Sequence, residues 1–478
     1  MAGLMIDRLR KMWQTPGGRG FIMLAVMSAA LGFALNAHTN IVTNYFEQIL
    51  HLSGPQFGYI TAIREVGGFI LIFLSAVLYR ISLQKVTAGA LVILAVGYGF
   101  FGVSTSFLTV IPWVIITSLG FHTVLQTQYF LGMSLTTEAK SGSVLGRMAA
   151  YGQAGTFAAL VIVFLVFHFH LFSFKATFVL LGVVALVGAI AIFRFPHLHE
   201  GAERRVAPKR DRIVWRRAYR YYYLLNLLDG ARQQVFFSFG LWVLVNRYNL
   251  TVSEISLVLL AVTFASMMSS SYVGRMIDRH GERRILSVIN IAYVVALAGY
   301  ALAGNVVLAC VFYLIYAFIT PFSPIAASTY LRKIAVPEEV ASSLAMGVTL
   351  LHSTAIVVPV AAGFILNYVG YRVPFFIACG FAVITFFITL RLDPVAQRIA
   401  GRVAFDDARL AAVAAGTMGA GQSDQDLTAA GDAAEATAVF MAMDGGSGEA
   451  AAGQAAIHSI IDRAESRDYP TQDEGDTQ

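Results

Sequence analysis

The chain has 478 residues, of which 57% are hydrophobic and only 13% are charged. Soluble globular proteins carry about 25% charged residues, so this chain lacks the polar surface that a water-soluble body of its length needs. The composition therefore excludes an ordinary soluble enzyme. The apolar residues fall into blocks of about 20, long enough to cross a hydrocarbon core of ~30 Å as helices, which predicts an all-α polytopic membrane protein.

The apolar blocks predict twelve membrane-spanning helices. Their expected ranges are 20–45, 57–79, 85–104, 108–131, 146–168, 174–194, 219–245, 254–274, 285–303, 306–328, 342–366 and 372–391. An even number of spans places both termini on one side of the membrane, and the loops on that side hold most of the Lys and Arg residues. By the positive-inside rule, we expect both termini in the cytoplasm. The Ala-, Arg- and Asp-rich loops and tail favour a bacterial inner membrane.

The formal net charge of +6 combines two regions of opposite sign. Residues 392–478 hold 15 acidic and 5 basic side chains, whereas the preceding part holds 29 basic and 13 acidic ones. The basic residues lie in short loops between spans, where they report orientation and do not indicate a nucleic acid partner. The composition after residue 392 predicts a cytoplasmic, acidic, Ala- and Gly-rich tail that is disordered.

The two halves of the chain repeat each other. A shift of 198 residues lays residues 32–81 over residues 230–279 without a gap, with Gly32 on Gly230. Two parallel six-helix halves joined by a charged linker are typical of transporters rather than of channels or anchored enzymes. The expected domains are a first bundle at 1–194, a basic cytoplasmic linker at 195–217, a second bundle at 218–391 and the tail at 392–478.

The segment GRMIDRHGERRIL, residues 274–286, follows the eighth predicted span. It resembles the signature loop of the major facilitator superfamily. The matching residues are Gly274, Asp278, Arg279, Gly281, Arg283 and Arg284. Together with the spans and the repeat, the resemblance covers residues of about 15–391 and implies two pseudo-symmetric six-helix bundles, alternating access and a cytoplasmic gating role for this loop. Asp278 is suited to hold a cation or a helix N-terminus of the other bundle.

The first half departs from this pattern. Ala76 stands where the loop has its first Gly, and Arg80 stands where the second half has Asp278. The fifth span also lacks the Gly-Pro motif that the family's antiporters carry, which weakens the case for drug–proton exchange. A gate that works through an acidic residue is therefore expected only in the second half.

Charged residues interrupt two spans near the bilayer midplane. Arg64 and Glu65 lie in the second span, Asp229 and Arg232 in the seventh, each ~14 Å deep at ~1.5 Å per residue. An unpaired charge there costs at least ~2.5–3.5 kcal/mol on insertion scales. Asp229 and Arg232, three residues apart, share a helix face and are expected to pair. Arg64 and Glu65, ~100° apart, are not expected to share a partner, so one should face the cavity and the other the opposite bundle.

Two interpretations of these charges remain open. In one, Glu65 and Asp229 are proton-coupling carboxylates, because burial and a neighbouring Arg act on the protonation of a carboxylate in opposite directions. In the other, the charges form structural ion pairs that lock the helices together. The arginines are also candidates for holding an anionic substrate.

Polar faces mark a candidate substrate site. The resemblance implies that spans 1, 4, 7 and 10 line a central cavity, and each has polar residues three or four apart on one face. Further residues on these faces are Thr43, Asn44 and Glu47 in span 1, Tyr129 in span 4, Asn226, Asp229 and Phe237 in span 7, and Tyr313 and Thr320 in span 10. The predicted substrate-binding residues are Asn36, Asn40, His122, Gln126, Arg232, Gln233, Tyr316 and, in span 11 at the position matching Gln153, His352.

These observations predict a secondary active transporter that moves a small solute by alternating access with proton coupling. The arginines favour an organic anion, whereas the amide and tyrosine faces suit a sugar or a neutral metabolite equally well. The alternative is a non-transporting membrane scaffold or sensor with the same fold. No convergent nucleophile–base set indicates an enzyme, and Cys310 and Cys379 lie in apolar blocks, so we expect no cofactor and no metal. The expected partners are the solute, protons and the lipid bilayer, and the chain is expected to be a monomer.

Overall fold

A computed structural model describes residues 10–78, 81–135, 141–196 and 215–414. Within these ranges the chain forms helices and no strand. The helices of the first half are α2 (Pro16–Gln48), α3 (Gly54–Leu78), α4 (Leu83–Phe101), α5 (Phe107–Met133), α6 (Ser141–His168) and α7 (Phe174–Phe193). Those of the second half are η2 (Arg217–Tyr219), α9 (Arg220–Asn246), α10 (Val252–His280), α11 (Glu282–Leu302), α12 (Val306–Ile319), α13 (Phe322–Ile334), α14 (Pro337–Val369), α15 (Arg372–Thr389) and α16 (Pro394–Ala414).

Local sequence signals set several of these helix starts. Thr15 accepts a hydrogen bond from the backbone N–H of Gly18, and Pro16 occupies the first helical position of α2. Ser106 and Thr251 form capping boxes at the starts of α5 and α10. Each cap satisfies backbone donors that the helix itself leaves unpaired, which matters most where no water is available.

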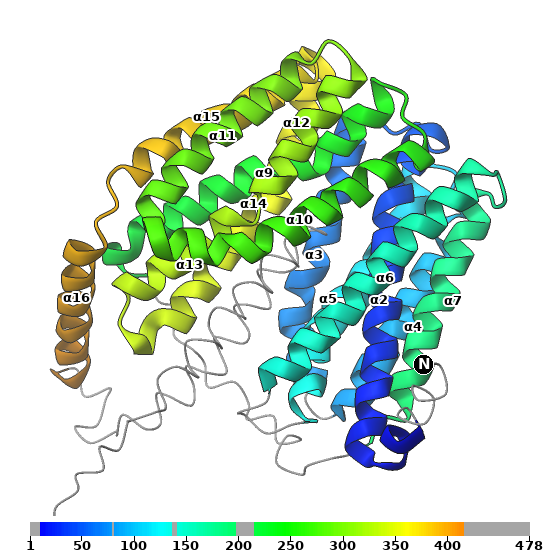
Figure 1. Cartoon of the computed structure of the whole chain (residues 1–478), viewed down its shortest axis with the longest axis horizontal. Coiled ribbons are helices and arrows are strands. Elements are labelled where there is room, and N and C mark those ends of the chain that lie inside the picture. Colours follow the sequence, from blue (N-terminus) through cyan, green and yellow to red (C-terminus); the bar gives the residue numbers. More distant parts are fainter. Residues whose placement is uncertain (1–9, 79–80, 136–140, 197–214, 415–478) are drawn as a thin grey trace, which may run out of the picture.

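The helices form two bundles that pack side by side, α2–α7 (blue to cyan) and α9–α15 (green to orange) (Figure 1). Their internal packing repeats: α2 packs on α6 as α9 packs on α14, and α4 packs on α7 as α11 packs on α15. Gly32 lies against the carbonyl of Gly152, and its repeat equivalent Gly230 lies against Leu351, at distances where an added Cβ would collide or fit tightly. The repeat predicted from the sequence is thus present in the packing.

Each bundle has a proximal and a distal end. The proximal end is where α2 begins and α15 ends, and the distal end carries the α2–α3 and α9–α10 connections, residues 49–53 and 247–251. Figure 1 shows the bundles meeting near their distal ends and diverging toward their proximal ends.

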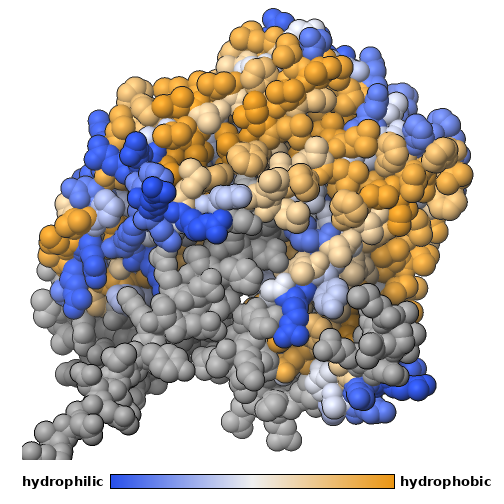
Figure 2. All heavy atoms as spheres, in the orientation of Figure 1, coloured by the Kyte–Doolittle hydropathy of each residue, from blue (hydrophilic) through white to orange (hydrophobic). Residues whose placement is uncertain are grey.

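Among the described residues, nine helices are long and apolar enough to cross a membrane, or ten if the bent α10 counts as one span. One of the nine is the broken pair α12–α13, Val306–Ile334. The helices α3 and α9 fill the second and seventh places in the bundles, which is consistent with the twelve spans expected from the sequence. Hydrophobic residues cover most of the described part of the two bundles on the side seen in Figure 2, as contact with a bilayer requires.

The tail differs from its expected disorder. Residues Pro394–Ala414 form α16, so the expectation of disorder from residue 392 is wrong for this segment; residues 415–478 lie outside the described residues. Tyr330 of α13 donates a hydrogen bond to Gln397, and Gly401 packs closely against the carbonyl of Ile334. The absence of a side chain at Gly401 permits this close approach of α16 to α13.

The segment 274–286 does not form a loop, because a single residue joins the two helices within it. The helix α10 continues to His280, Gly281 adopts φ +77°, and α11 begins at Glu282. Glycine is the residue that takes this backbone conformation without strain, so Gly281 permits two long helices to be joined this tightly.

Candidate functional site

A cavity of about 160 Å³ lies between the two bundles. Its polar lining residues are His38, Thr39, Thr43, Thr61, Arg64, Thr117, Gln234, Ser238 and Thr320. Its aromatic lining residues are Phe46, Phe57, Phe101, Phe236, Phe237 and Tyr313. Both bundles contribute hydroxyl groups and rings, and among the described residues no Asp or Glu lines the wall. A concave, largely apolar wall with a few convergent polar groups is typical of small-molecule sites.

Direct contacts between the bundles close the distal end. Asn40 donates a hydrogen bond to Ser256 at 2.7 Å, and Asn44 donates to the carbonyl of Leu250 at 2.8 Å. The amide of Asn246 donates to Glu47 at 2.5 Å. Because each bond joins α2 to the second half, the cavity is sealed from the distal side in this state.

A cross-bundle ion pair lies at the middle of α3. The guanidinium of Arg64 donates two hydrogen bonds to Glu65, at 2.8 and 3.1 Å, and the second carboxylate oxygen of Glu65 lies 3.5 Å from Nδ1 of His352 on α14. Arg64 is 52% exposed and lines the cavity, whereas Glu65 is only 6% exposed.

The sequence predicted that one residue of this pair faces the cavity and the other the opposite bundle, and this is confirmed: Arg64 lines the cavity and Glu65 contacts His352 of the other bundle. Arg64 also pairs with Glu65 itself, because its long side chain bends back to reach its neighbour.

The second charge pair lies inside the second bundle. Arg232 bonds to Asp229 at 2.9 Å, as the spacing predicted, and donates to Asn290 at 3.3 Å. Its guanidinium carbon stands 3.4 Å from the ring centroid of Tyr293, a cation–π contact, and the side chain is fully buried. The hydroxyl of Tyr293 donates to the carbonyl of Ile319 at the break between α12 and α13. This cluster therefore supports the broken helix.

None of the eight predicted substrate residues is among those that line the cavity in this state. Asn36 donates to Thr156 within the first bundle, Gln233 is buried, and Tyr316 stacks on Phe236 with ring centroids 3.6 Å apart. Of the further residues on these faces, four line the cavity, namely Thr43, Phe237, Tyr313 and Thr320. The remaining five do not, namely Asn44, Glu47, Tyr129, Asn226 and Asp229. Substrate binding by the eight residues, which also include Asn40, His122, Gln126, Arg232 and His352, stays a prediction.

The sequence interpretation missed six polar residues of the wall: His38, Thr39, Thr61, Thr117, Gln234 and Ser238. A signal for two of them was present, because the shift of 198 places Gln234 on Asn36 and Ser238 on Asn40. The ring of His38 packs 4.8 Å from Tyr98 and 5.0 Å from Phe101, which places it among aromatic residues of the first bundle.

The predicted gating residues lie at the proximal end, where Asp278, Arg279, Arg283 and Arg284 are exposed. The gating role of these residues and of Gly274 stays a prediction. The buried acid of this turn is Glu282, which is 2% exposed and pairs with Lys333 of α13 at 2.7 Å. The sequence interpretation passed over it.

The end of the linker is fixed to the start of α14. Arg216 donates to Glu339 at 2.8 Å, and the hydroxyl of Tyr219 donates to the other oxygen of the same carboxylate at 2.8 Å. The hydrogen bond with Glu339 raises the pKa of Arg216, and burial together with the same carboxylate raises the pKa of Tyr219. Both donors therefore keep their protons at neutral pH.

Comparison with known proteins agrees with this architecture. Residues 222–414 match the family model of the Major Facilitator Superfamily. The structure of the nucleoside transporter NupG matches with a TM-score of 0.66 at 14% identity, over 78% of this chain and 100% of that chain. The second half of the chain thus matches this family's model, and the chain has the major facilitator fold. The solved structures that share this fold are transporters.

Two further structures show the same fold at low identity. A bacterial homologue of the human lysosomal transporter Spinster, in an inward-facing and occupied conformation, matches with a TM-score of 0.60 at 13% identity, over 77% of this chain and 95% of that one. The human organic anion transporter MFSD10 matches with a TM-score of 0.51 at 14% identity, over 79% and 100% of the two chains. A search of curated proteins gave no match.

Proposed function

We propose that this protein is a proton-coupled transporter of a small organic anion in the inner membrane. In this proposal the proximal end faces the cytoplasm, as the basic loops predict, so the distal seal closes the outer side. The two bundles would then rock about the cavity and open it to each side in turn.

The position of Arg64 is the observation that carries this proposal. Among the described residues of the cavity wall, Arg64 is the one Lys, Arg, Asp or Glu, and its carboxylate partner Glu65 lies off that wall. Its guanidinium is half-exposed, so a carboxylate or other oxyanion can reach it through water. A guanidinium binds oxyanions through parallel hydrogen bonds, and the surrounding hydroxyl groups and rings suit the organic part of such a solute.

In this proposal proton movement is coupled to transport because Glu65 and the anionic solute compete for the guanidinium of Arg64. While Arg64 bonds to Glu65, the buried carboxylate has a cationic partner and stays ionised. An anionic solute that binds Arg64 competes for the guanidinium, and a buried carboxylate deprived of that partner favours its protonated form. The protonated Glu65 would also weaken its contact with His352, which joins the bundles. Solute binding, protonation and bundle movement are thereby linked.

The comparison proteins support a small solute without fixing its class. Their names include a nucleoside transporter and an organic anion transporter, at identities that establish only the fold. The choice of an anion rests on Arg64 and on the absence of acids from the described cavity wall.

The test is solute-dependent proton movement with the purified full-length protein in sealed proteoliposomes. A panel of organic anions, nucleosides and sugars is added outside while a pH-sensitive dye reports the external pH. We expect alkalinisation with one class of organic anion. A signal only with neutral solutes would overturn the anion assignment. No solute-driven signal from folded protein would favour the scaffold or sensor.

Two matched neutral variants test the coupling carboxylate. Glu65→Gln should abolish proton movement while anion exchange continues, because the amide cannot release a proton. Asp229→Asn should retain the same ratio of protons to solute, because Asp229 lies inside one bundle, away from the cavity wall. Proton movement that persists in Glu65→Gln would show that Glu65 is not the coupling group.

A further inference from the structure

A second hollow lies at the distal end, on the far side of the seal from the central cavity. Its volume is about 580 Å³. It is lined by Leu52, Ser53, Gly54, Trp242, Val243, Asn246, Arg247, Leu366, Asn367 and Tyr371. The name distal pocket refers to this set of residues.

The walls of the distal pocket come from both bundles. Residues 52–54 belong to the end of the α2–α3 connection and the first residue of α3, whereas Trp242, Arg247 and Asn367 belong to the second bundle. Gly54 lies so close to the carbonyl of Gly363 on α14 that a Cβ would collide with it. The pocket therefore exists as one site only while the distal ends of the bundles touch.

The charge of the distal pocket is positive. Arg247 lines it, and the guanidinium carbon lies 4.8 Å from the ring centroid of Tyr371, which holds the side chain over the site. Among the described residues Arg247 forms no ion pair, and no Asp or Glu lines the pocket. Glu47 is not part of the wall and accepts a hydrogen bond from Asn246. The amide of Asn367 adds a further polar group.

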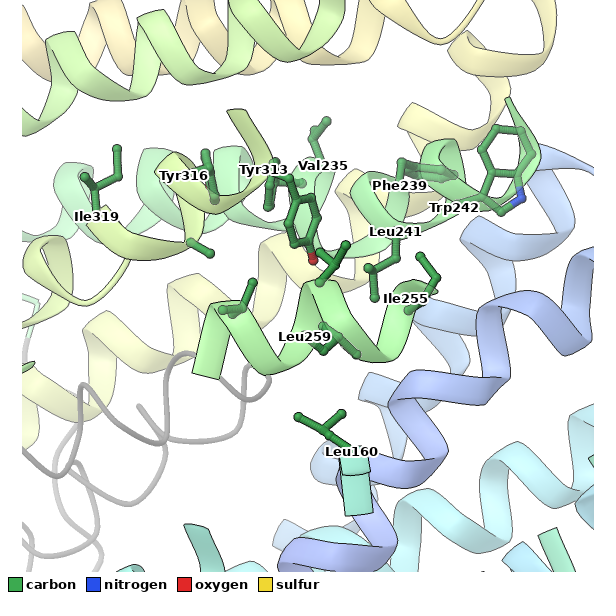
Figure 3. Close-up of a cluster of buried hydrophobic side chains, with 14 of the residues drawn as sticks. Leu160, Val235, Phe239, Leu241, Trp242, Ile255, Leu259, Tyr313, Tyr316 and Ile319 are labelled. Atoms are coloured by element: carbon green, nitrogen blue, oxygen red, sulfur yellow. The ribbon is translucent and has the colours of Figure 1, made fainter. Parts of the chain in front are cut away.

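Trp242 supplies an unsatisfied donor in the wall. The residue is only 7% exposed, and its ring N–H has no hydrogen-bond partner among the described residues. In Figure 3 the nitrogen of Trp242 points away from the neighbouring apolar side chains of the cluster. A buried donor without an acceptor costs about 1–3 kcal/mol, so an acceptor atom in the pocket would be favoured.

The geometry points to the distal pocket as a binding site for a small organic anion. Arg247 is the charge partner of the anion, and Trp242 is a hydrogen-bond donor to it. The bound anion holds the distal end closed. A ligand that contacts both bundles binds only the state in which they meet. By linkage it shifts the population toward that state. An anion on the distal side would then slow opening toward that side without entering the central cavity.

The test measures binding and distal closure directly and does not depend on transport. The probe is benzenesulfonate, which is charged at every working pH, and the neutral benzenesulfonamide of nearly the same shape is its control. Spin labels at Ile49→Cys and Tyr368→Cys report the distance between the bundles at the distal end, in full-length protein whose Cys310 and Cys379 are replaced by Ala. Calorimetry on unlabelled protein reports the affinity.

We expect benzenesulfonate to raise the population with the short distal distance and benzenesulfonamide to leave it unchanged. Arg247→Gln should weaken the binding of benzenesulfonate by about tenfold or more, the loss of one charge-assisted interaction. Arg372→Gln is the matched control: it removes a neighbouring arginine that also contacts Tyr371, at 5.9 Å, but does not line the pocket. The affinity of Arg372→Gln for benzenesulfonate should equal that of the unsubstituted protein.

Three results would overturn the inference. The first is an unchanged distal distance at saturating benzenesulfonate. The second is a benzenesulfonate affinity that changes equally in Arg247→Gln and Arg372→Gln, which would indicate a nonspecific response to charge at this end. The third is loss of the effect in Arg64→Gln, which would show that the anion acts from the central cavity. Failure of the transporter proposal would leave this test unaffected.

Discussion

The two buried Arg–carboxylate pairs have the same chemistry and different surroundings. Asp229 and Arg232 lie within one bundle, where Asn290 and Tyr293 surround a guanidinium that is fully buried. Arg64 and Glu65 lie between the bundles, where the guanidinium is half-exposed and the carboxylate contacts His352 of the other bundle. The first pair is enclosed by groups that keep their positions when bundles move as bodies, whereas the second must change its contacts.

This difference indicates how charges at the same depth acquire different roles. A buried pair whose members have each other as main partners is costly to break and does not exchange with solvent. A pair with one member open to water exchanges partners at little cost. Depth in the membrane, which the sequence shows, is therefore less informative than the number of bundles that a pair joins.

The largest expected effect is on stability, for the enclosed pair. Arg232→Ala leaves Asp229 as an uncompensated buried charge and removes the support under Tyr293, so we expect a loss of about 3–5 kcal/mol of unfolding free energy. The measurement is thermal or denaturant unfolding of purified protein in detergent. Arg64→Ala is the control and should lose far less. Equal losses in the two variants would contradict the distinction between the pairs.

The next effect is on binding, for the pair between the bundles. Arg64→Gln removes a charge-assisted hydrogen bond of about 1.5–3 kcal/mol, which corresponds to a KM for the organic anion raised roughly 10- to 100-fold. The stability of the folded protein should change little, because water replaces the guanidinium. Uptake at varied solute concentration measures the effect. An unchanged KM with a reduced maximal rate would instead place Arg64 in the conformational step.

The same contrast between one bundle and two applies to two glycines. A Cβ at Gly32 would collide with the backbone of Gly152 in the same bundle, and a Cβ at Gly58 would collide with the backbone of Pro359 in the other bundle. Gly32→Ala should cost about 1–3 kcal/mol of stability, because packing inside a bundle has no alternative arrangement. Gly58→Ala should instead open the distal end, which relieves the collision.

Labelling of the sealed cavity measures this difference. A cysteine at Thr43 in the cavity wall, in protein without Cys310 and Cys379, reacts with an impermeant maleimide added from the distal side only when the seal opens. We expect faster labelling with Gly58→Ala and an unchanged rate with Gly32→Ala. Faster labelling with both variants would show that the bundles do not move as separate bodies.

The sequence predicted those features that depend on spacing along the chain. Apolar blocks located the spans, the shift of 198 residues located the repeat, and a separation of three residues paired Asp229 with Arg232. These features follow from helix geometry alone. The turn at Gly281 and the helix α16 were not predicted, because a polar segment of this kind is also compatible with a loop.

The rotation of each helix was the feature that the sequence did not determine. Consecutive residues point ~100° apart around a helix. The sequence predicted Gln233 as a substrate residue, whereas its neighbour Gln234 is the one that lines the cavity. Bilayer-spanning helices weaken the usual guide, since lipid and protein interior are both apolar and amphipathic patterning is faint. Placing such a face requires the packing of the neighbouring helices.

The smallest expected effect is on stability, for a third ion pair, Lys333–Glu282. Lys333 is 48% exposed and bonds at 2.7 Å to Glu282, whose position at the start of α11 also exposes it to unpaired backbone N–H groups. Since water and the helix terminus both replace the ammonium group, Lys333→Gln should cost about 1 kcal/mol or less. Unfolding in detergent at low and high salt measures it, with the exposed neighbour Arg332→Gln as control. A loss of stability as large as that of Arg232→Ala would show that burial of the acid alone sets the cost, and that exposure of the cation does not matter.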